Sequence, residues 1–405
     1  MTSPALKPAS ETDDSDLPLR AEVLDGYQEF AGLRQEWQAL FDSVDGAGWS
    51  CNPEVFHTWT QVLRQGGKAL IISVRDTAGK LRGLMPLMQD LAWRGPAAAP
   101  RFDYDPRDRG LIANRRVRPI PVRQITTMGS LPATMLWVGP LCQPQDTEGV
   151  CHAIAGTILK LPGWDVAILP AIEGVEDLLW SRAFAAQGVS ARIQTLGRVV
   201  QDIQRLVPFQ QIVDRQKKKF RQNVRRAHAA AQEAGVRFEF HSGQAAVKAM
   251  FGTVERLASA SWKHEGRDGT EVHIAYHGNQ QAFFERLLAS KGLTAEPVLG
   301  VALDADGSLA VLLMLRHGIT LTALLTFWDG RQPAASPGLL LLGAAIDWAV
   351  AQGATRFDFN ATAPWVRYLV DVERTVCHVM VFAPTLRGRV LAGIDGLSRR
   401  LRGSA

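Results

Sequence analysis

Residues 296–329 read EPVLGVALDADGSLAVLLMLRHGITLTALLTFWD, and this stretch decides the fold. It holds three apolar runs of strand length, which the turn pairs Asp306-Gly307 and His317-Gly318 separate. Two strands joined by so short a turn lie beside each other and run in opposite directions. The stretch therefore predicts three neighbouring antiparallel strands.

The sequence on both sides adds helices and further strands. Upstream, apolar residues recur at steps of three and four from Phe220 to Ala234, which predicts an amphipathic helix that ends at Gly235. The strand VRFEFHS and two helices follow it. Downstream come the helix LLLLGAAIDWAVAQG, the strand TRFDFN and a last strand, VCHVMVFAP. The resulting order is strand, two helices, three strands, helix, strand and final strand.

The first half of the chain echoes this order, interrupted by an irregular Pro- and Arg-rich segment from about Trp93 to Ser130. We therefore predict an α/β protein of two similar units, each a mixed, mostly antiparallel sheet flanked by helices. The predicted division is a disordered tail over residues 1–18, an N-terminal unit over 19–203 and a C-terminal unit over 204–405.

Composition narrows the class of protein. The 405 residues are 46% hydrophobic and carry a net charge of +5, which is too small to indicate a partner by itself. The four cysteines form no CxxC pair, so we expect no metal site and a reducing, cytoplasmic location. The most apolar run, from Leu339, contains Asp347 and is too short to span a bilayer, and the N-terminus lacks the pattern of a signal peptide. We expect a soluble protein.

Three motifs resemble those of GNAT-superfamily acyltransferases of the CelD/BcsL-like family. They are KKKFRQNVRRAHAAAQEAGVRFEF (217–240), SASWKHEGRDGT (259–270) and SPGLLLLGAAIDWAVAQGATRFDF (336–359). In the first half, LRQEWQAL, NPEVFHTWT and RGLMPLM are also similar to that family. The resemblance implies two GNAT-like units in tandem, as in FemABX-type proteins, and transfer of an acyl group from acyl-CoA.

One part of the sequence departs from the family's pattern. The family commonly follows its Asp-Phe strand with a Tyr-Lys pair, whereas this chain continues DFNATAPWVRYLV. Trp365, Arg367 and Tyr368 occupy the region without a lysine. The role that the resemblance implies for the lysine of that pair has no matching residue in this stretch.

Acyl transfer from coenzyme A needs a cradle for the pyrophosphate, and Ser336, Pro337, Gly338 and Leu339 have the required chemistry. The first N–H groups of a helix are unpaired and lie at the positive end of its dipole, so they bind anions. Proline suits a first helical turn, and glycine lets a ligand approach the backbone closely. An ordinary capped helix is the alternative.

Asp358 and Tyr368 are the candidate catalytic residues. Asp358 alternates with Phe357 and Phe359 at the end of a strand, a place from which it could orient or deprotonate the acceptor. A carboxylate that caps the following loop is the alternative. The resemblance implies that Tyr368 protonates the departing thiolate, and a buried structural tyrosine is the alternative.

Two further regions are candidates for binding substrate. Trp262 and Lys263 come at the end of a helix and could line the acceptor pocket, although a core tryptophan and a solvated lysine fit as well. In the basic helix, Arg221 and Arg225 lie away from the apolar stripe. Such a charge run is usually a solvated face; the alternatives are binding of a CoA phosphate or an anionic acceptor, and binding of tRNA. We favour a small anion over tRNA, because Phe220 belongs to the apolar stripe and not to an exposed basic surface.

The sequence thus predicts an acyl-CoA-dependent acyltransferase, most simply an acetyltransferase, with acyl-CoA as co-substrate. The expected acceptor is an amine or hydroxyl of a small molecule or of a polysaccharide or cell-envelope precursor, a class that only the resemblance implies. The alternatives are a FemABX-like transferase that uses aminoacyl-tRNA and a non-catalytic GNAT pair that serves as a scaffold. The C-terminal stretch RGRVLAGIDGLSRRLRG has an apolar side and an arginine side, which suits either peripheral contact with a membrane or packing on its own domain.

Overall fold

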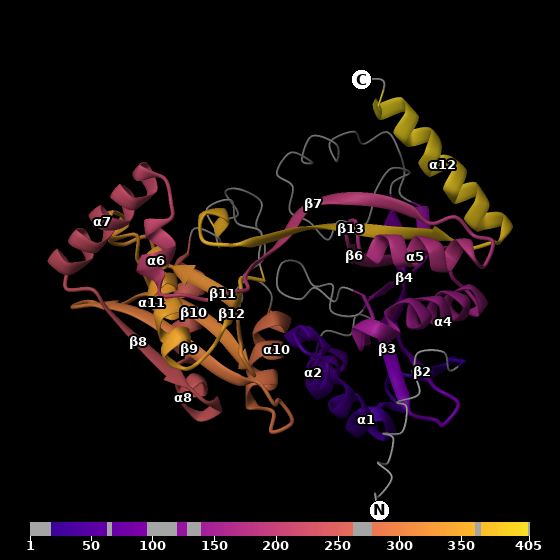
Figure 1. The fold of residues 1–405 in the computed structure, drawn as a ribbon, viewed down its shortest axis with the longest axis horizontal. Coiled ribbons are helices and arrows are strands. Elements are labelled where there is room, and N and C mark those ends of the chain that lie inside the picture. The colour runs from indigo at the N-terminus through magenta and orange to yellow at the C-terminus, as the bar shows by residue number, and fades with distance from the viewer. Residues whose placement is uncertain are drawn as a thin grey trace, which may run out of the picture.

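The computed structural model describes residues 18–62, 67–94, 120–127, 139–261, 278–360 and 366–403. Two lobes lie side by side, and two long strands, β7 (Arg192–Ile203) and β13 (Val372–Phe382), cross from one lobe to the other (Figure 1). The predicted disordered tail lies outside the described residues apart from Pro18.

The first lobe begins with a strand, two helices and a hairpin. Helix α1 forms because its apolar side chains recur at helical spacing, and Leu33, Trp37 and Phe41 are all buried on one side of it. The elements of this half are β1 (Arg20–Asp25), α1 (Phe30–Ser43), η2 (Trp49–Cys51), α2 (Pro53–Val62), β2 (Lys68–Arg75), β3 (Leu81–Arg94), β4 (Ile120–Thr127), β5 (Leu141–Cys142), η4 (Pro144–Asp146), α4 (Thr147–Lys160), β6 (Val166–Ile172), α5 (Glu176–Ala185) and β7.

The second half repeats the plan with a longer set of helices. Its elements are α6 (Phe209–Asp214), α7 (Lys218–Glu233), β8 (Arg237–Ser242), α8 (Gln244–Ala249), α9 (Phe251–Ala260), α10 (Gly278–Ala289), β9 (Glu296–Asp304), β10 (Gly307–His317), β11 (Thr320–Trp328), η5 (Pro333–Ala335), α11 (Pro337–Ala351), β12 (Arg356–Asp358), η6 (Val366–Tyr368), β13 and α12 (Leu386–Gly403). The three strands predicted over residues 296–329 are β9, β10 and β11, and they pair antiparallel in chain order.

The described strands form one sheet of 13 strands. Its order is β1-β2-β3-β4-β6-β13-β7-β12-β11-β10-β9-β8, with β5 paired to β3. Strand β13, the last along the chain, is inserted between β6 and β7 and pairs antiparallel with both. Strand β7 continues past it and pairs with β12 through Asp202 and Ile203. These two strands therefore join the lobes into a single sheet.

Each lobe has the same internal arrangement. In the first, β1 to β4 pair antiparallel in chain order, and β4 pairs parallel with β6. In the second, β8 to β11 pair antiparallel, and β11 pairs parallel with β12. A helix makes the crossover within each parallel pair, α4 in the first lobe and α11 in the second. The predicted fold, two α/β units with mixed sheets flanked by helices, is confirmed.

The strand pairing bears on two further predictions. The division at residues 203/204 stays a prediction, and the pairing adds that β13 lies in the sequence of the second unit but beside β6 of the first. The segment predicted to be irregular contains a strand, β4, so that prediction is wrong for Ile120–Thr127. Both faces of β4 are buried, as Ile125 and Thr126 show, so its sequence lacks the alternation of a half-buried strand.

Helix α11 is buried against the sheet of the second lobe. Its residues Leu341, Ala345 and Ile346 pack in one core with Phe357 of β12. By length and composition the helical stretch Pro333–Ala351 would suffice to cross a membrane, but half of the window is buried inside the protein, as expected of a core helix.

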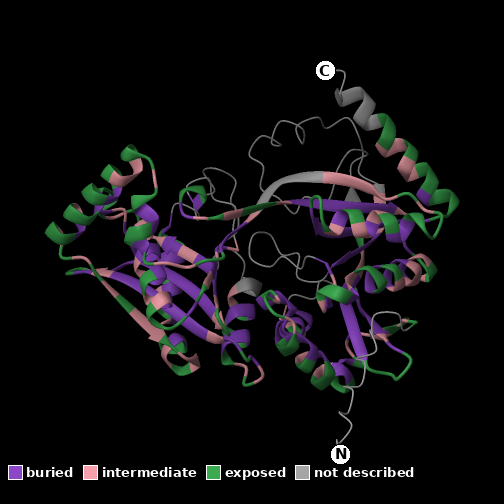
Figure 2. Ribbon diagram, viewed as in Figure 1, coloured by how far each residue is buried: buried purple, intermediate pink, exposed green. Residues whose placement is uncertain are grey.

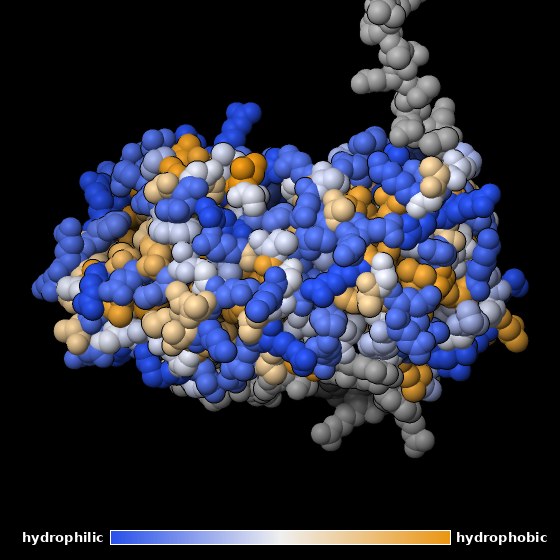
Figure 3. Space-filling view, turned by 90° about the horizontal axis from the view of Figure 1, so that it is seen from below, coloured by the Kyte–Doolittle hydropathy of each residue, from blue (hydrophilic) through white to orange (hydrophobic). Residues whose placement is uncertain are grey.

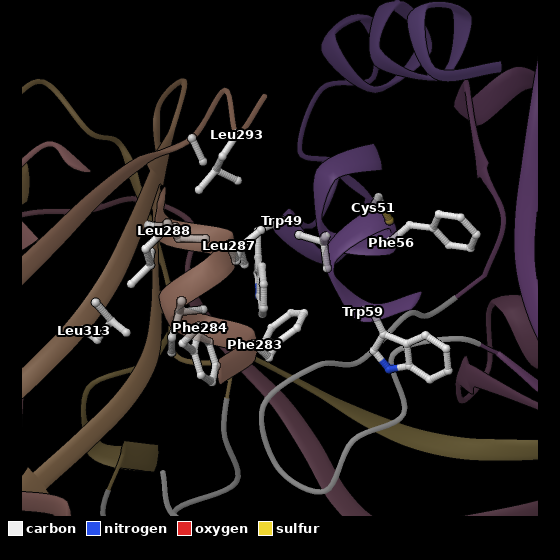
Figure 4. Close-up of a cluster of buried hydrophobic side chains, with 14 of the residues drawn as sticks. Trp49, Cys51, Phe56, Trp59, Phe283, Phe284, Leu287, Leu288, Leu293 and Leu313 are labelled. Atoms are coloured by element: carbon white, nitrogen blue, oxygen red, sulfur yellow. The ribbon is translucent and has the colours of Figure 1, made fainter. Parts of the chain in front are cut away.

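The lobes also meet through a hydrophobic core between α2 and α10. Trp49 and Phe56 from the first lobe and Phe283 and Leu287 from the second belong to one cluster of buried side chains (Figures 2 and 4). At its edge, Asn52 Nδ2 donates a hydrogen bond of 3.0 Å to Thr294 Oγ1. The lobes are therefore held together by buried apolar surface as well as by the shared strands.

The face of the molecule seen in Figure 3 is mainly hydrophilic, with hydrophobic residues in separate patches. Helix α12 projects from the first lobe (Figure 1). Its Leu391 packs onto a small buried cluster, whereas Leu386, Val390 and Leu397 are exposed. The helix thus packs on β4 and β6 of the first lobe and on Met380 of β13, not on the other described elements of the predicted C-terminal unit, and it leaves one apolar side in solvent. Its contact with a membrane remains a prediction.

The buried contact between the lobes predicts a large loss of stability for Phe283→Ala. Phe283 is fully buried, so the substitution should lower the free energy of unfolding by about 3–5 kcal/mol through lost burial and a cavity. Chemical denaturation measures this change. Leu178→Ala, at a site that is 54% exposed, is the control and should stay within about 0.5 kcal/mol of the wild type. A loss below about 1 kcal/mol for Phe283→Ala would contradict the described contact.

Candidate active site

The sheet of the second lobe opens between β11 and β12. The two strands share only the register pairs from Thr320↔Arg356 to Thr322↔Asp358, and β12 ends there. Strand β11 continues to Trp328, paired on its other side with β10. The stretch from Thr322 to Trp328 spans about 20 Å at the rise of a β-strand. Asp358 therefore stands where the two strands part, and the start of α11 follows the far end of β11.

A β-bulge interrupts β11 within this open stretch. The register passes from Leu313↔Leu325 to Met314↔Ala323, so Leu324 is the extra residue. An extra residue in a bulge is left out of the ladder, so its backbone groups are free for other partners. The bulge is two residues beyond Thr322, the register partner of Asp358. It therefore brings a backbone N–H to the region that an acyl group must reach, and sequence analysis missed it.

The predicted cradle is the first turn of α11. Ser336, at the N-cap, has φ 44°, a left-handed conformation that a non-glycine residue rarely adopts. The N–H groups of Leu339 and Leu340 both donate to Ser336 O, and Pro337 has no N–H. A Cβ added to Gly338 would meet nothing within 4 Å. The turn therefore offers the Gly338 backbone to a ligand with open space beside it.

The basic helix α7 lies against this turn. Ala227 and Ala231 of α7 pack with Ala335 and Leu340 in a small buried cluster. The N-terminus of α11 and the basic residues of α7 therefore belong to the same end of the lobe (Figure 1). The contact supports the prediction that α7 helps to bind an anion. The N-terminus of α11 and the basic residues of α7 both contribute positive electrostatic potential at this place.

The two predicted arginines differ in their surroundings. Arg221 donates to Gln216 O at 2.6 Å and to Asp214 O at 3.4 Å, so it also fixes the turn between α6 and α7. Arg225 is exposed. Binding of substrate by either residue stays a prediction, and Arg225 is the better position at which to test it.

The environment of Asp358 changes its acidity. Burial raises the pKa of this carboxyl from 3.8 to about 6, the N–H of Asn360 lowers it through a hydrogen bond of 2.8 Å, and the charge of Asp202 raises it further. The contact with Asn360, whose φ is 45°, shows that Asp358 also holds the following loop, as the structural alternative requires. A pKa near 6 in addition makes Asp358 a competent proton acceptor at neutral pH.

A second carboxylate faces Asp358, and sequence analysis did not identify it. Asp202 of β7 is the register partner of Asp358, and Arg374 of β13 donates to Asp202 Oδ2 at 2.8 Å. These residues are far apart in the sequence, and only the pairing of three strands brings them together. The local sequence around Asp202 predicts a strand, but it does not indicate which other strand pairs with it.

Tyr368, the second predicted catalytic residue, lies against the basic helix α7. The ring of Tyr368 stacks at an angle on Phe220 of α7, with centroids 5.4 Å apart. Tyr368 is 42% exposed, so the buried structural tyrosine considered as an alternative is wrong. Trp262, Lys263 and Trp365 lie outside the described residues.

The corresponding helix of the first lobe has the opposite charge at its start. Helix α4 follows the buried Asp146, whose carboxylate accepts two hydrogen bonds from Arg82, at 2.9 and 3.0 Å. The Asp146 side chain makes no hydrogen bond that caps α4. The helix start of the first lobe thus has a buried ion pair in place of the open glycine turn at the start of α11.

Comparison with known proteins identifies a domain in the second half of the chain. Residues 218–365 match the family described as "Acetyltransferase (GNAT) domain", a region that contains α7, α11 and Asp358. No curated protein matches the chain. Residues 218–365 are therefore a GNAT-type acyltransferase domain.

Solved structures share the fold across most of the chain. The structure of FemX has a TM-score of 0.53 and 11% identity, covering 85% of this chain and 95% of its own. A protein of unknown function from Bacteroides thetaiotaomicron has a TM-score of 0.51 and 9% identity, covering 86% and 97%. A tandem GNAT protein from the clavulanic acid biosynthesis pathway has a TM-score of 0.47 and 10% identity, covering 91% and 99%. At these identities the FemX and Bacteroides structures show the fold alone.

The cradle makes a direct prediction for Gly338→Glu. The substitution places a bulky carboxylate at the start of α11, where it would repel a pyrophosphate and fill the open space. We expect the affinity for acetyl-CoA in calorimetry to fall at least about tenfold, which corresponds to roughly 1.4 kcal/mol. Gly252→Glu, at another position where an added Cβ meets nothing within 4 Å, is the control. An unchanged affinity in folded Gly338→Glu would remove residues 336–339 from the site.

Proposed function

We propose that this chain transfers an acyl group, most simply acetyl, from acyl-CoA to an amine or hydroxyl. One observation carries the proposal: an open helix start and a carboxylate of raised pKa flank the same parted strands, β11 and β12. The first suits the anionic end of the donor and the second suits the proton of the acceptor. The separation of about 20 Å along β11 leaves room for an extended donor between them.

Each candidate residue has a separate role in the proposed reaction. The backbone around Gly338 binds the pyrophosphate, and the exposed basic residues of α7 add positive potential beside it. The Leu324 N–H donates to the thioester carbonyl and stabilises the negative charge that develops on its oxygen. Asp358 accepts the proton of the attacking group. Tyr368 is the candidate donor of a proton to the departing sulfur.

The two lobes have different roles in this proposal. The second lobe holds the donor and the catalytic residues, because its helix start has an open glycine turn, whereas that of the first lobe has the buried Asp146–Arg82 ion pair. The CelD/BcsL-like resemblance of the motifs supports a polysaccharide or cell-envelope precursor as acceptor and a cytoplasmic enzyme. Those assignments rest on the motifs alone.

Asp358→Asn tests the proposed base. The substitution should lower kcat about 10²-fold or more and leave the affinity for acetyl-CoA nearly unchanged. For the wild type, kcat/KM should rise with pH through about 6, because the base must be ionised, and the variant should lose this rise.

The raised pKa of Asp358 also makes the stability of the protein depend on pH, in the opposite direction. The folded wild type loses stability as pH rises from about 4 to 6, because its Asp358 holds the proton more tightly than the same residue does in the unfolded chain. The variant should therefore be no less stable than the wild type at pH 7.5. Normal turnover would leave Asp358 with its structural role only.

The alternative is a transferase that uses aminoacyl-tRNA, which the exposed basic residues of α7 favour. Arg225→Glu separates the two proposals, with Arg182→Glu on α5 as the control for charge reversal on an exposed helix. If α7 follows a tRNA backbone, the wild type should bind tRNA with an affinity that falls steeply with salt, and the variant should have a flatter salt slope. We expect weak, non-specific tRNA binding and, in Arg225→Glu, weaker binding of acetyl-CoA or of an anionic acceptor. Sub-micromolar tRNA binding at physiological salt would overturn this expectation.

A further inference from the structure

Helix α12 presents a stripe of apolar side chains to solvent. Leu386, Val390 and Leu397 are 81%, 53% and 61% exposed. They are four and then seven positions apart along the chain, so at 3.6 residues per turn they lie within about 40° of one another around the helix axis. Large apolar side chains that are exposed in a row, and not singly, mark a surface that binds a partner. We call these three residues the apolar stripe.

The opposite side of the helix is fixed to the protein. Leu391 packs onto the small buried cluster that β4, β6 and β13 form, and Asp395 pairs with Arg192 of β7. A Cβ added to Gly388 would clash with Ala383 O, so the first turn of the helix lies directly against the end of β13. The attachment leaves the apolar stripe on the side of the helix that is turned away from the lobe.

Positive charge lies on both sides of the apolar stripe. Arg389 is exposed about 60° from Leu386 in one direction, and Arg387 is about 100° from it in the other. The Arg387 side chain is half exposed although its Nε is 3.2 Å from Asp165 Oδ2. The helix has one acidic residue, Asp395, against five arginines, which are Arg387, Arg389, Arg399, Arg400 and Arg402.

The width and the charge of this surface argue against a protein or a nucleic acid as its partner. A stable protein interface takes roughly 20–30 residues from each side, whereas the apolar stripe has three. A second copy of α12 placed against the first would also bring arginines together, which repel one another. A nucleic acid would match the arginines but leave the apolar side chains in water.

A membrane surface matches both features. An amphipathic helix in the plane of a bilayer buries its apolar side at the boundary of the acyl chains and holds its basic residues at the headgroups. Anionic headgroups attract each arginine, and the long arginine stem can reach them from beside the apolar stripe. The 18 residues of α12 provide a contact line of about 27 Å.

We propose that α12 binds the surface of a membrane that contains anionic lipids. Leu386, Val390 and Leu397 enter the boundary of the acyl chains, and Arg389 lies among the headgroup phosphates. The contact is peripheral, because the other side of the helix stays packed on the first lobe. The first lobe then holds the protein on the membrane, while the candidate active site is in the second. None of these residues belongs to that site, so the proposal stands apart from acyl transfer.

Co-sedimentation of the full chain with lipid vesicles tests the proposal. We expect binding to vesicles that mix phosphatidylcholine with phosphatidylglycerol, weaker binding at high salt, and little binding to pure phosphatidylcholine. The double variant Leu386→Ser/Leu397→Ser should lower the partition coefficient at least about tenfold, because two leucines no longer leave water. Arg389→Glu should lower it about tenfold at low salt and less at high salt.

Matched changes on α5 are the controls. Leu178→Ser, at a site that is 54% exposed, and Arg182→Glu should bind vesicles as the wild type does. All the changed side chains are exposed, so each variant should keep the circular dichroism and the Tm of the wild type.

Three results would overturn the proposal. One is the absence of wild-type binding to the anionic vesicles, and another is unchanged binding of the folded double variant. The third is a wild type that light scattering shows to be a dimer while the double variant is a monomer, because a second copy would then cover the apolar stripe. Equal binding to both kinds of vesicle would overturn the role of the arginines.

Discussion

The antiparallel pairing of β7 with β13 is the constraint on which the site depends. One strand ends the first half of the chain and the other ends the second, yet they lie side by side across both lobes. Their pairing brings Asp202 next to β12 and places Arg374 within reach of its carboxylate. Without it, the second sheet would end at β12, and Asp358 would have no second carboxylate beside it.

The same pairing explains why the two halves form one body. Each lobe obtains part of its sheet from the other half of the chain, and the buried contact between α2 and α10 adds a hydrophobic core. A site that draws residues from both halves needs such a fixed arrangement, because catalytic groups lose efficiency when their spacing varies. The two lobes therefore share the same strand arrangement, but the residues at their corresponding helix starts differ. The helix start in the first lobe has the buried Asp146 paired with Arg82, whereas that in the second has the open Gly338.

Much of the fold could be predicted from local patterns. The turns at Asp306-Gly307 and His317-Gly318 are set by neighbouring residues, and so is the start of α11 at Ser336-Pro337. Strand β4 escaped detection because it is buried on both faces and lacks a period of two. The place of β13 escaped for another reason: the strand itself was evident, but local sequence does not say which strand it will pair with.

For the candidate site too, the local sequence revealed some residues and could not reveal those that depend on strand pairing. Asp358 could be identified because a strand, a loop and a motif all lie within one short stretch. Asp202 could not, because its importance comes entirely from a partner 156 positions away along the chain, at a contact that three strands create. The bulge at Leu324 was also hidden, since it is a mismatch in length between two strands that look regular on their own.

The most direct test of this account is a crystal structure of the protein with acetyl-CoA. It should show the pyrophosphate on the backbone of residues 336–339, the donor extended between β11 and β12, and the thioester carbonyl directed at the Leu324 N–H beside Asp358. Acetyl-CoA bound at the start of α4 in the first lobe, or away from the parted strands, would contradict it.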